Sequence, residues 1–281
     1  MINKMPSSAP KIGLALSGGA VRGLAHVGVL RALIENRIPI HCIAGTSAGS
    51  IVGGAYAAGM PIDEIDELGR KLRWRHIGRL TMSRLGMKSN QRLEHYMRAR
   101  LPITKFEDLP IPFATVATDL KTNTAVVMKD RGDVPFAIRA SCTIPGWYVP
   151  VIDDQGRQLV DGGLVAVIPS VVTRSLGADI VIAVDVNSEG ATFFGSSSSG
   201  SVLGVLLQSM MVVQQTASAY QLERSDFVIS PRVGHFRWDK MGRADELIAA
   251  GYEAGLQSIG QIRQLIDSAT SKEAQREEML A

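Results

Sequence analysis

Two units of strand, glycine turn and helix fill the first 60 residues, and they constrain the fold more than any other feature. In the first unit, the apolar run 12–16 ends in Ser17-Gly18-Gly19, and apolar residues then recur at helical spacing. In the second, the apolar run 40–44 ends in Gly45-Thr46-Ser47-Ala48-Gly49, and a helix of small residues follows. Repeated units of this kind predict neighbouring parallel strands whose glycine turns meet at one edge of a sheet.

Later apolar runs alternate with helical stretches, which predicts an α/β fold with a mostly parallel central sheet and helices on both faces. Further strands are expected at 113–118, 125–128, 158–160, 180–186 and 227–229. At 281 residues the chain suits one large domain with an extension.

The expected organisation has three parts. We expect an N-terminal tail over 1–10, one domain over 11–235, and a C-terminal helical extension over 236–281 packed on the same domain. Within the domain we expect a basic helical insertion near 62–108 and a mobile loop near 188–201, where a Gly/Ser run cannot bury enough apolar surface to fix its conformation.

Charge is concentrated between Arg70 and Arg100. This segment has ten basic residues and one acid, Glu94, giving +9 in a chain whose total is +3. Apolar residues such as Leu72 and Trp74 are interleaved with the basic ones. The composition fits either a lid on an anionic membrane surface or a solvated helical face balanced by acids elsewhere.

No apolar run precedes the first strand, and the apolar helix expected at 202–213 is shorter than the ~20 residues that span a bilayer. That helix is expected to be buried or to face another subunit, so a homo-oligomer is an open alternative. Cys42 and Cys142 lack metal-ligand spacing and are expected to be reduced and buried. We therefore expect a cytoplasmic protein, with peripheral contact at the inner membrane surface as an option, and no metal, cofactor or nucleic-acid partner.

Gly45-x-Ser47-x-Gly49 between a strand and a helix matches a nucleophile elbow, in which glycines permit the sharp turn that exposes a serine hydroxyl. Alone, the pattern also occurs by chance in small-residue turns. The preceding loop, 17–23, opens onto a helix N-terminus, and its N–H groups would suit an oxyanion. A dinucleotide fingerprint is disfavoured, because Ala20 replaces its middle glycine and no acid ends the second strand.

A third motif, Asp161-Gly162-Gly163, places an acid at the end of an expected strand, with two glycines that let the backbone turn away. An Asp-Gly-Gly sequence is by itself usually only a turn. The motif becomes informative only in combination with the elbow at Ser47 and the glycine loop over 17–23.

Together these motifs resemble the patatin-like phospholipase family, and most closely its small bacterial members of the RssA type. Four blocks match in order: the glycine loop with Arg22, the elbow around Ser47, Ala-Ser-Cys-Thr-Ile-Pro at 140–145, and Asp161-Gly-Gly. The likeness covers 11–235 and implies a three-layer α/β architecture. It also implies a serine acyl hydrolase of lipid esters, with Ser47 as nucleophile and Asp161 as base. The resemblance assigns the oxyanion hole to the N–H groups around Gly18, Gly19 and Ala20.

Three points qualify this resemblance. The family commonly has a third glycine where Ala20 stands, and a β-carbon there costs ~1 kcal/mol if φ is positive. Arg22 either braces the loop or contacts a substrate phosphate, and we favour bracing because buried loops need internal donors. A carboxylate of ordinary pKa ~3.9 is a weak base toward a hydroxyl, so burial must raise the pKa of Asp161.

Two other interpretations stay open at this point. One is an α/β-hydrolase with a Ser47, Asp161 and His235 triad, whose chain order is right but whose nucleophile would follow too few strands. The other is a binding or regulatory protein with a vestigial hydrolase site.

Overall fold

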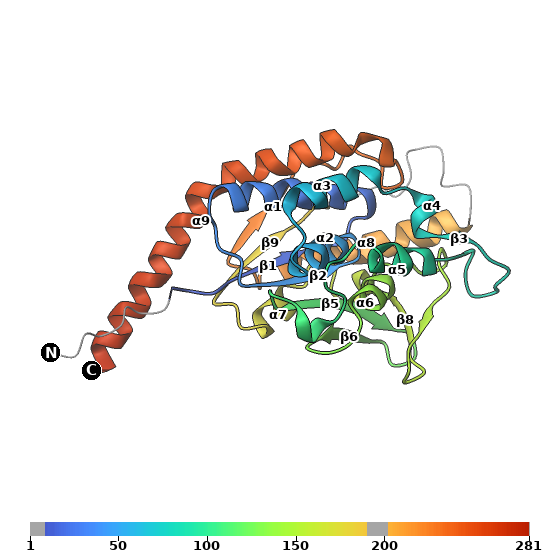
Figure 1. Ribbon diagram of the computed structural model, residues 1–281, viewed down its shortest axis with the longest axis horizontal. Helices are drawn as coiled ribbons and strands as arrows, with labels where there is room; N and C mark the ends of the chain where they lie inside the picture. The colour runs from blue at the N-terminus through green and yellow to red at the C-terminus, as the bar shows by residue number, and fades with distance from the viewer. Residues whose placement is uncertain (1–8, 190–201, 281) are drawn as a thin grey trace.

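The computed structural model describes residues 9–189 and 202–280, and its centre is an eight-stranded sheet (Figure 1). The strand order is β10-β9-β1-β2-β5-β8-β7, with β6 also paired to β5. The strands are β1 (Ile12–Leu16), β2 (Cys42–Thr46), β5 (Phe113–Asp119), β6 (Thr124–Lys129), β7 (Val151–Ile152), β8 (Gln158–Asp161), β9 (Ile180–Val184) and β10 (Phe227–Ile229). The α/β class predicted from the sequence is confirmed.

The sheet has a parallel part and an antiparallel part, and β5 is the strand where they meet. β10, β9, β1, β2 and β5 pair in parallel, whereas β6, β8 and β7 add antiparallel ladders. Thr46 of β2 pairs with Val116 of β5, and the next residue of β5, Ala117, pairs with Asp161 of β8. The end of β2 and the end of β8 therefore lie at the same level on either side of β5.

Both faces of the sheet are covered. Along β1, Leu14 and Leu16 belong to the main hydrophobic core, whereas Ala15 packs in a second cluster with Val181 and Ala183 of β9. Successive side chains of a strand point to opposite faces, so each cluster marks one covered face. The covering helices are α1 (Ala25–Glu35), α2 (Ala48–Ala57), α6 (Val134–Ser141), α7 (Ser170–Ser175), α8 (Val202–Leu222) and α9 (Ala244–Leu280).

Helix α9 lies along α1, and two glycines allow the close approach. A β-carbon on Gly28 would overlap the carbonyl of Ile248, and one on Gly251 would overlap the carbonyl of Ala25. The Tyr252 hydroxyl adds a hydrogen bond to Glu35 at 2.7 Å. Beyond this contact α9 continues past the body of the molecule (Figure 1).

The segment 62–108 combines helices with a hairpin that the sequence did not predict. Its helices are α3 (Ile62–Lys71), α4 (Trp74–Ile77) and α5 (Gln91–Arg98). Between α4 and α5 the strands β3 (Arg79–Leu80) and β4 (Lys88–Ser89) pair in antiparallel fashion. Two-residue strands are too short to show an alternating pattern, which explains why the sequence suggested only helices.

Helix α8 extends nine residues beyond the apolar run that predicted it, and only part of it is buried. Leu207 is buried, whereas Val205, Leu206, Val212 and Val213 are exposed, so this face of α8 is not buried within the chain and the alternative that it faces another subunit stays a prediction. Among the described residues, no helix has both the length and the apolar content to cross a membrane. The mobile loop expected at 188–201 lies, from residue 190 onward, outside the described residues.

Candidate active site

Ser47 occupies the turn between β2 and α2 in a backbone conformation that side-chain-bearing residues rarely adopt. Its φ is 52° and its ψ is −120°. Two glycines make this tight turn possible, because a β-carbon on Gly45 would collide with the backbone of Gly49, and one on Gly49 with the carbonyl of Leu16. Non-glycine residues with positive φ cost on the order of 1–3 kcal/mol and persist where the surroundings impose them. The strain and the strand–turn–helix context match the elbow that the sequence predicted.

Asp161 approaches Ser47 from β8, on the other side of β5. A β-carbon on Gly162 would overlap the carbonyl of Val116, so glycine there lets the chain pass close over β5. Asp161 is 5% exposed, and its Oδ1 accepts a hydrogen bond from the Gly163 N–H at 2.8 Å.

Burial raises the pKa of Asp161 to about 6, against smaller opposing effects of hydrogen bonds from the Ser47 side chain and the Gly163 N–H. The carboxyl group is therefore a stronger base than an ordinary aspartate, and it lines the same pocket as Ser47. This is the strengthening that a serine–aspartate pair requires.

The block 140–145 links the two residues. The Ser47 N–H donates to the Ser141 Oγ at 2.8 Å, and the Asp161 N–H donates to the Thr143 carbonyl at 2.8 Å. Thr143 is itself held by the Asn90 side chain, whose Nδ2 donates to Oγ1 at 2.8 Å. The sequence drew attention to this block only through its resemblance, and it offered no role for Ser141.

The glycine loop supplies fewer free donors than expected. The Gly18 N–H donates to the Val167 carbonyl at 2.9 Å, so it is engaged in the fold, which corrects its assignment to the oxyanion hole. The N–H groups of Gly19 and Ala20 donate to no other described residue. Ala20 has a φ of 48°, so the β-carbon that replaces the family's glycine does stand in a strained position.

The buried side chain of Arg22 connects the glycine loop to the segment 234–236 by hydrogen bonds. It is 1% exposed, and its Nε and Nη2 donate to the carbonyls of Phe236 and Gly234 at 2.8 and 3.1 Å. Burial lowers the pKa of this guanidinium, while the charge of Glu189 raises it. These contacts match the bracing role that the sequence favoured.

The histidines of this region do not complete a triad. His235 is exposed, its ring lies against Phe236 with centroids 4.1 Å apart, and it lines neither pocket that contains Ser47. His26 is buried, and its Nε2 lies 2.9 Å from the Ser17 carbonyl, while burial lowers its pKa to about 4. The triad with His235 is therefore not formed in this structure. Among the described residues, no group of three His, Cys, Asp or Glu side chains is placed to hold a metal ion.

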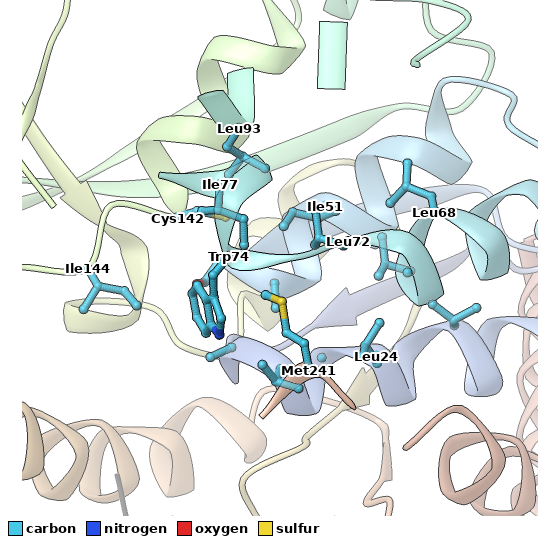
Figure 2. A pocket seen from close by; sticks show the side chains of 18 of the residues that line it. Leu24, Ile51, Leu68, Leu72, Trp74, Ile77, Leu93, Cys142, Ile144 and Met241 are labelled. Carbon is cyan, nitrogen blue, oxygen red and sulfur yellow. The ribbon is translucent and has the colours of Figure 1, made fainter. Parts of the chain in front are cut away.

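Ser47 is one of the residues that line an apolar pocket, and Figure 2 shows side chains of the walls of this pocket. Its volume is about 770 Å³, its mouth included. The walls come from the glycine loop, α2, α3, α4 and the block after α6, and are made by side chains such as those of Leu24, Ile51, Leu68, Leu72, Trp74, Ile77, Ile144 and Met241. Cys142 is also in the wall, and burial raises the pKa of its thiol well above the ordinary value, so the thiol stays protonated.

A second, more polar pocket of about 490 Å³ is also lined by Ser47. Asp161, Asn187 and Gln214 contribute to its walls, together with the glycine loop and Met210 and Met211 of α8. Ala20, Ser47 and Ile144 border both pockets. Ser47 thus borders both an apolar pocket and a second pocket whose lining is more polar.

Asn187 and Gln214 were not predicted as site residues. The Asn187 Nδ2 donates to the Gly18 carbonyl at 2.7 Å, and its Oδ1 is buried with no hydrogen-bond partner among the residues that the structure describes. Its position just after β9, beside the glycine loop after β1, was a usable signal, because ligands bind beyond the carboxyl ends of parallel strands. Gln214 carried a weaker signal, as a polar residue following an apolar helical run.

The chain resembles known proteins in both sequence and fold. The model of the patatin-like phospholipase family matches residues 14–171. An uncharacterised NTE-family protein of Mycobacterium tuberculosis is 40% identical over 188 residues, covering 66% of this chain and 51% of that protein. The lysophospholipase NTE1 of Mycosarcoma maydis is 37% identical over 185 residues, covering 63% of this chain and 10% of that enzyme.

The chain thus spans about half, or much less, of the length of these relatives. Among solved structures, VipD from Legionella pneumophila has the same fold, with a TM-score of 0.56 at 15% identity over 94% of this chain and 68% of that one. Since the family model covers more than half of the 281 residues, the chain belongs to the patatin-like phospholipase family.

Proposed function

We propose that the protein is a serine acyl hydrolase that cleaves carboxylic esters of lipids, of the phospholipase, lysophospholipase or esterase type. The observation that carries the proposal is the position of Ser47, which borders an apolar pocket and also a second, more polar pocket that Asp161 lines as well. A lipid ester has the same two-sided character, because an acyl chain and a polar alcohol meet at the bond to be cleaved.

In the proposed reaction, the Ser47 Oγ attacks the ester carbonyl carbon while its proton passes to the Asp161 carboxylate. The negative charge that develops on the carbonyl oxygen is stabilised by the N–H groups of Gly19 and Ala20. Donors fixed in place before charge develops are effective, and losing one typically costs about 3–4 kcal/mol. This stabilisation supplements a base that is weaker than histidine.

Asp161 then returns the proton to the departing alcohol oxygen, which leaves an acyl ester on Ser47. Water attacks this ester in the second half of the cycle, giving up its proton to Asp161, and the acid product is released as the Ser47 Oγ regains a proton. The same carboxyl group thus acts as base and acid in turn.

We assign one part of the proposed substrate to each of the two pockets. The acyl chain enters the apolar pocket, where burying each methylene gains ~0.8 kcal/mol. The alcohol and its head group lie in the second, more polar pocket, where the side-chain amides of Asn187 and Gln214 offer hydrogen bonds. Because the substrate is a lipid, we also propose peripheral contact with an anionic membrane through residues 70–100.

The test is hydrolysis of p-nitrophenyl esters of increasing chain length and of a lysophospholipid by the purified protein. We expect activity that rises with chain length and is abolished by Ser47→Ala, with an unchanged melting temperature because removal of this hydroxyl leaves no cavity. Full activity in the variant would refute the role of Ser47. No activity of the unaltered protein on any of these esters would favour a binding or regulatory protein with a vestigial site.

A further inference from the structure

The β3–β4 hairpin, residues 79–89, exposes large apolar side chains around its tip. Leu80, Met82 and Leu85 are 76%, 107% and 62% exposed. Figure 1 shows the hairpin at the end of the molecule opposite to the C-terminal end of α9. Clusters of exposed apolar side chains usually mark interaction surfaces.

The basic residues of this region divide into two groups. Arg70, Lys71 and Arg98 form ion pairs with acids of α3, α5, α6 and α9 or their flanks. The other seven form no ion pair with any residue that the structure describes; they are Arg73, Arg75, Arg79, Arg84, Lys88, Arg92 and Arg100. The unbalanced charge is therefore centred on the hairpin and its flanks, and Arg79 and Arg84 stand beside the apolar tip.

A hollow of about 590 Å³ lies beside the hairpin base, lined by Arg79, Ser89, Gln91, Arg92 and His95. Its lining includes two guanidinium groups and no acid. Guanidinium groups bind phosphate with paired hydrogen bonds, so the hollow suits an anionic head group.

The hairpin base rests on the wall of the apolar pocket. The Lys88 N–H donates to the Trp147 carbonyl at 3.0 Å, and the Val149 N–H donates to the Lys88 carbonyl at 2.9 Å. Tyr148, which lies between Trp147 and Val149 in the chain, lines the pocket. Trp74 and Ile77 of α4, just before the hairpin, line it as well. A surface bound by the hairpin would lie next to the proposed acyl-chain pocket.

We propose that the β3–β4 hairpin docks the protein on an anionic lipid surface. Leu80, Met82 and Leu85 enter the head-group layer, while Arg79 and Arg84 meet lipid phosphates. Apolar insertion and cationic attraction together are typical of reversible interfacial binding. The inference rests on the proposed lipid-ester hydrolysis, and it assigns the membrane contact to the hairpin and not to the ion-paired helix α3.

The experiment measures binding of the full chain to sedimented vesicles of phosphatidylcholine alone or with one third phosphatidylglycerol. We expect tight binding only to the anionic vesicles, falling steeply between low and high salt. The double variant Arg79→Gln/Arg84→Gln should lose about 30-fold in affinity, the effect of two basic residues near an anionic surface. Leu80→Ser/Leu85→Ser should lose about tenfold or more by removing the inserted side chains.

Two matched control variants replace exposed basic or exposed apolar side chains that lie outside the hairpin. Arg131→Gln/Lys272→Gln removes two exposed cations that lie outside the segment and form no ion pair with a described residue. Val171→Ser/Leu256→Ser removes two exposed apolar side chains of α7 and α9. Both controls should bind within about twofold of the unaltered protein, because surface changes away from the contact have small effects.

Hydrolysis of a soluble short-chain ester is measured on every variant. Loss of vesicle binding with unchanged soluble-ester hydrolysis supports the hairpin as the docking element. Equal binding of hairpin variants and controls, or equal binding to neutral and anionic vesicles, overturns the docking proposal while leaving the hydrolase proposal standing. Absence of soluble-ester hydrolysis in the unaltered protein overturns the proposed function whatever the vesicles show.

Discussion

The N–H of Ser47 donates a hydrogen bond to the side chain of Ser141, 94 residues further along the chain. Two residues beyond Ser141, the Thr143 carbonyl accepts the N–H of Asp161. One short segment at the C-terminal end of α6 therefore holds both partners of the proposed dyad, and the distance between them depends on this segment.

We predict that Ser141→Ala lowers kcat on a soluble ester about tenfold or more and destabilises the fold by about 1–3 kcal/mol, since it leaves the buried Ser47 N–H without an acceptor. Steady-state kinetics and urea unfolding measure the two effects. Ser141→Thr keeps the hydroxyl and should recover most of kcat. If Ser141→Ala lost stability alone, with kcat unchanged, Ser141 would be structural only.

Asp161→Asn should reduce kcat nearly as much as Ser47→Ala, because an amide cannot accept the proton of the serine. His235→Ala should leave kcat within about twofold, since the exposed ring lines neither pocket at Ser47. Loss of most kcat in the His235 variant, with stability retained, would instead indicate a triad.

The raised pKa of Asp161 has opposite consequences for activity and stability. Because the carboxylate is the active form, kcat/KM should rise with pH through about 6. Folding favours the protonated acid, so its contribution to stability is full below the ordinary pKa and is lost as the pH rises through about 6. The free energy of unfolding of Asp161→Asn should therefore exceed that of the unaltered protein by about 2–3 kcal/mol at pH 7.5, and the two should differ little at pH 4. Urea unfolding at the two pH values checks this, and equal differences at both would contradict it.

Ala20→Gly is expected to stabilise the protein by about 0.5–1 kcal/mol. Relief of the positive φ gains about 1–2 kcal/mol, and the added freedom of glycine in the unfolded chain offsets about 0.4–1 kcal/mol. Ala20→Val should destabilise it, because a β-branched residue fits this conformation still less well. Thermal unfolding compares the three proteins, and a stabilised valine variant would show that the loop relaxes to another conformation.

The sequence predicted the parallel part of the sheet well, because each of those strands is a buried apolar run. β1 was predicted with the bounds that the structure shows. The run predicted for β2, 40–44, begins and ends two residues too early, because the last residues of the strand, Gly45 and Thr46, are not apolar. The short strands β3, β4 and β7 were missed, since two residues carry no periodicity.

Local motifs also predicted the turn at Ser47 and the acid at the end of β8. They could not predict that the Gly18 N–H is engaged by Val167, or that Ser141 holds Ser47, because both bonds join residues far apart in the chain. Bonds of this kind depend on how the strands are ordered in the sheet, which no short window of sequence records.

Because β5 lies between the ends of β2 and β8, the proposed active site can assemble only late in the synthesis of the chain. Ser47 is synthesised 114 residues before Asp161, and the two meet only after β8 has paired with β5. The loop beside Ser47 is not braced until the carbonyls of Gly234 and Phe236 reach Arg22. A ribosome-bound chain would thus carry Ser47 without the proposed base, Asp161, for much of its synthesis. The proposed hydrolysis is therefore expected only after Asp161, Gly234 and Phe236 have been synthesised and have reached their places in the fold.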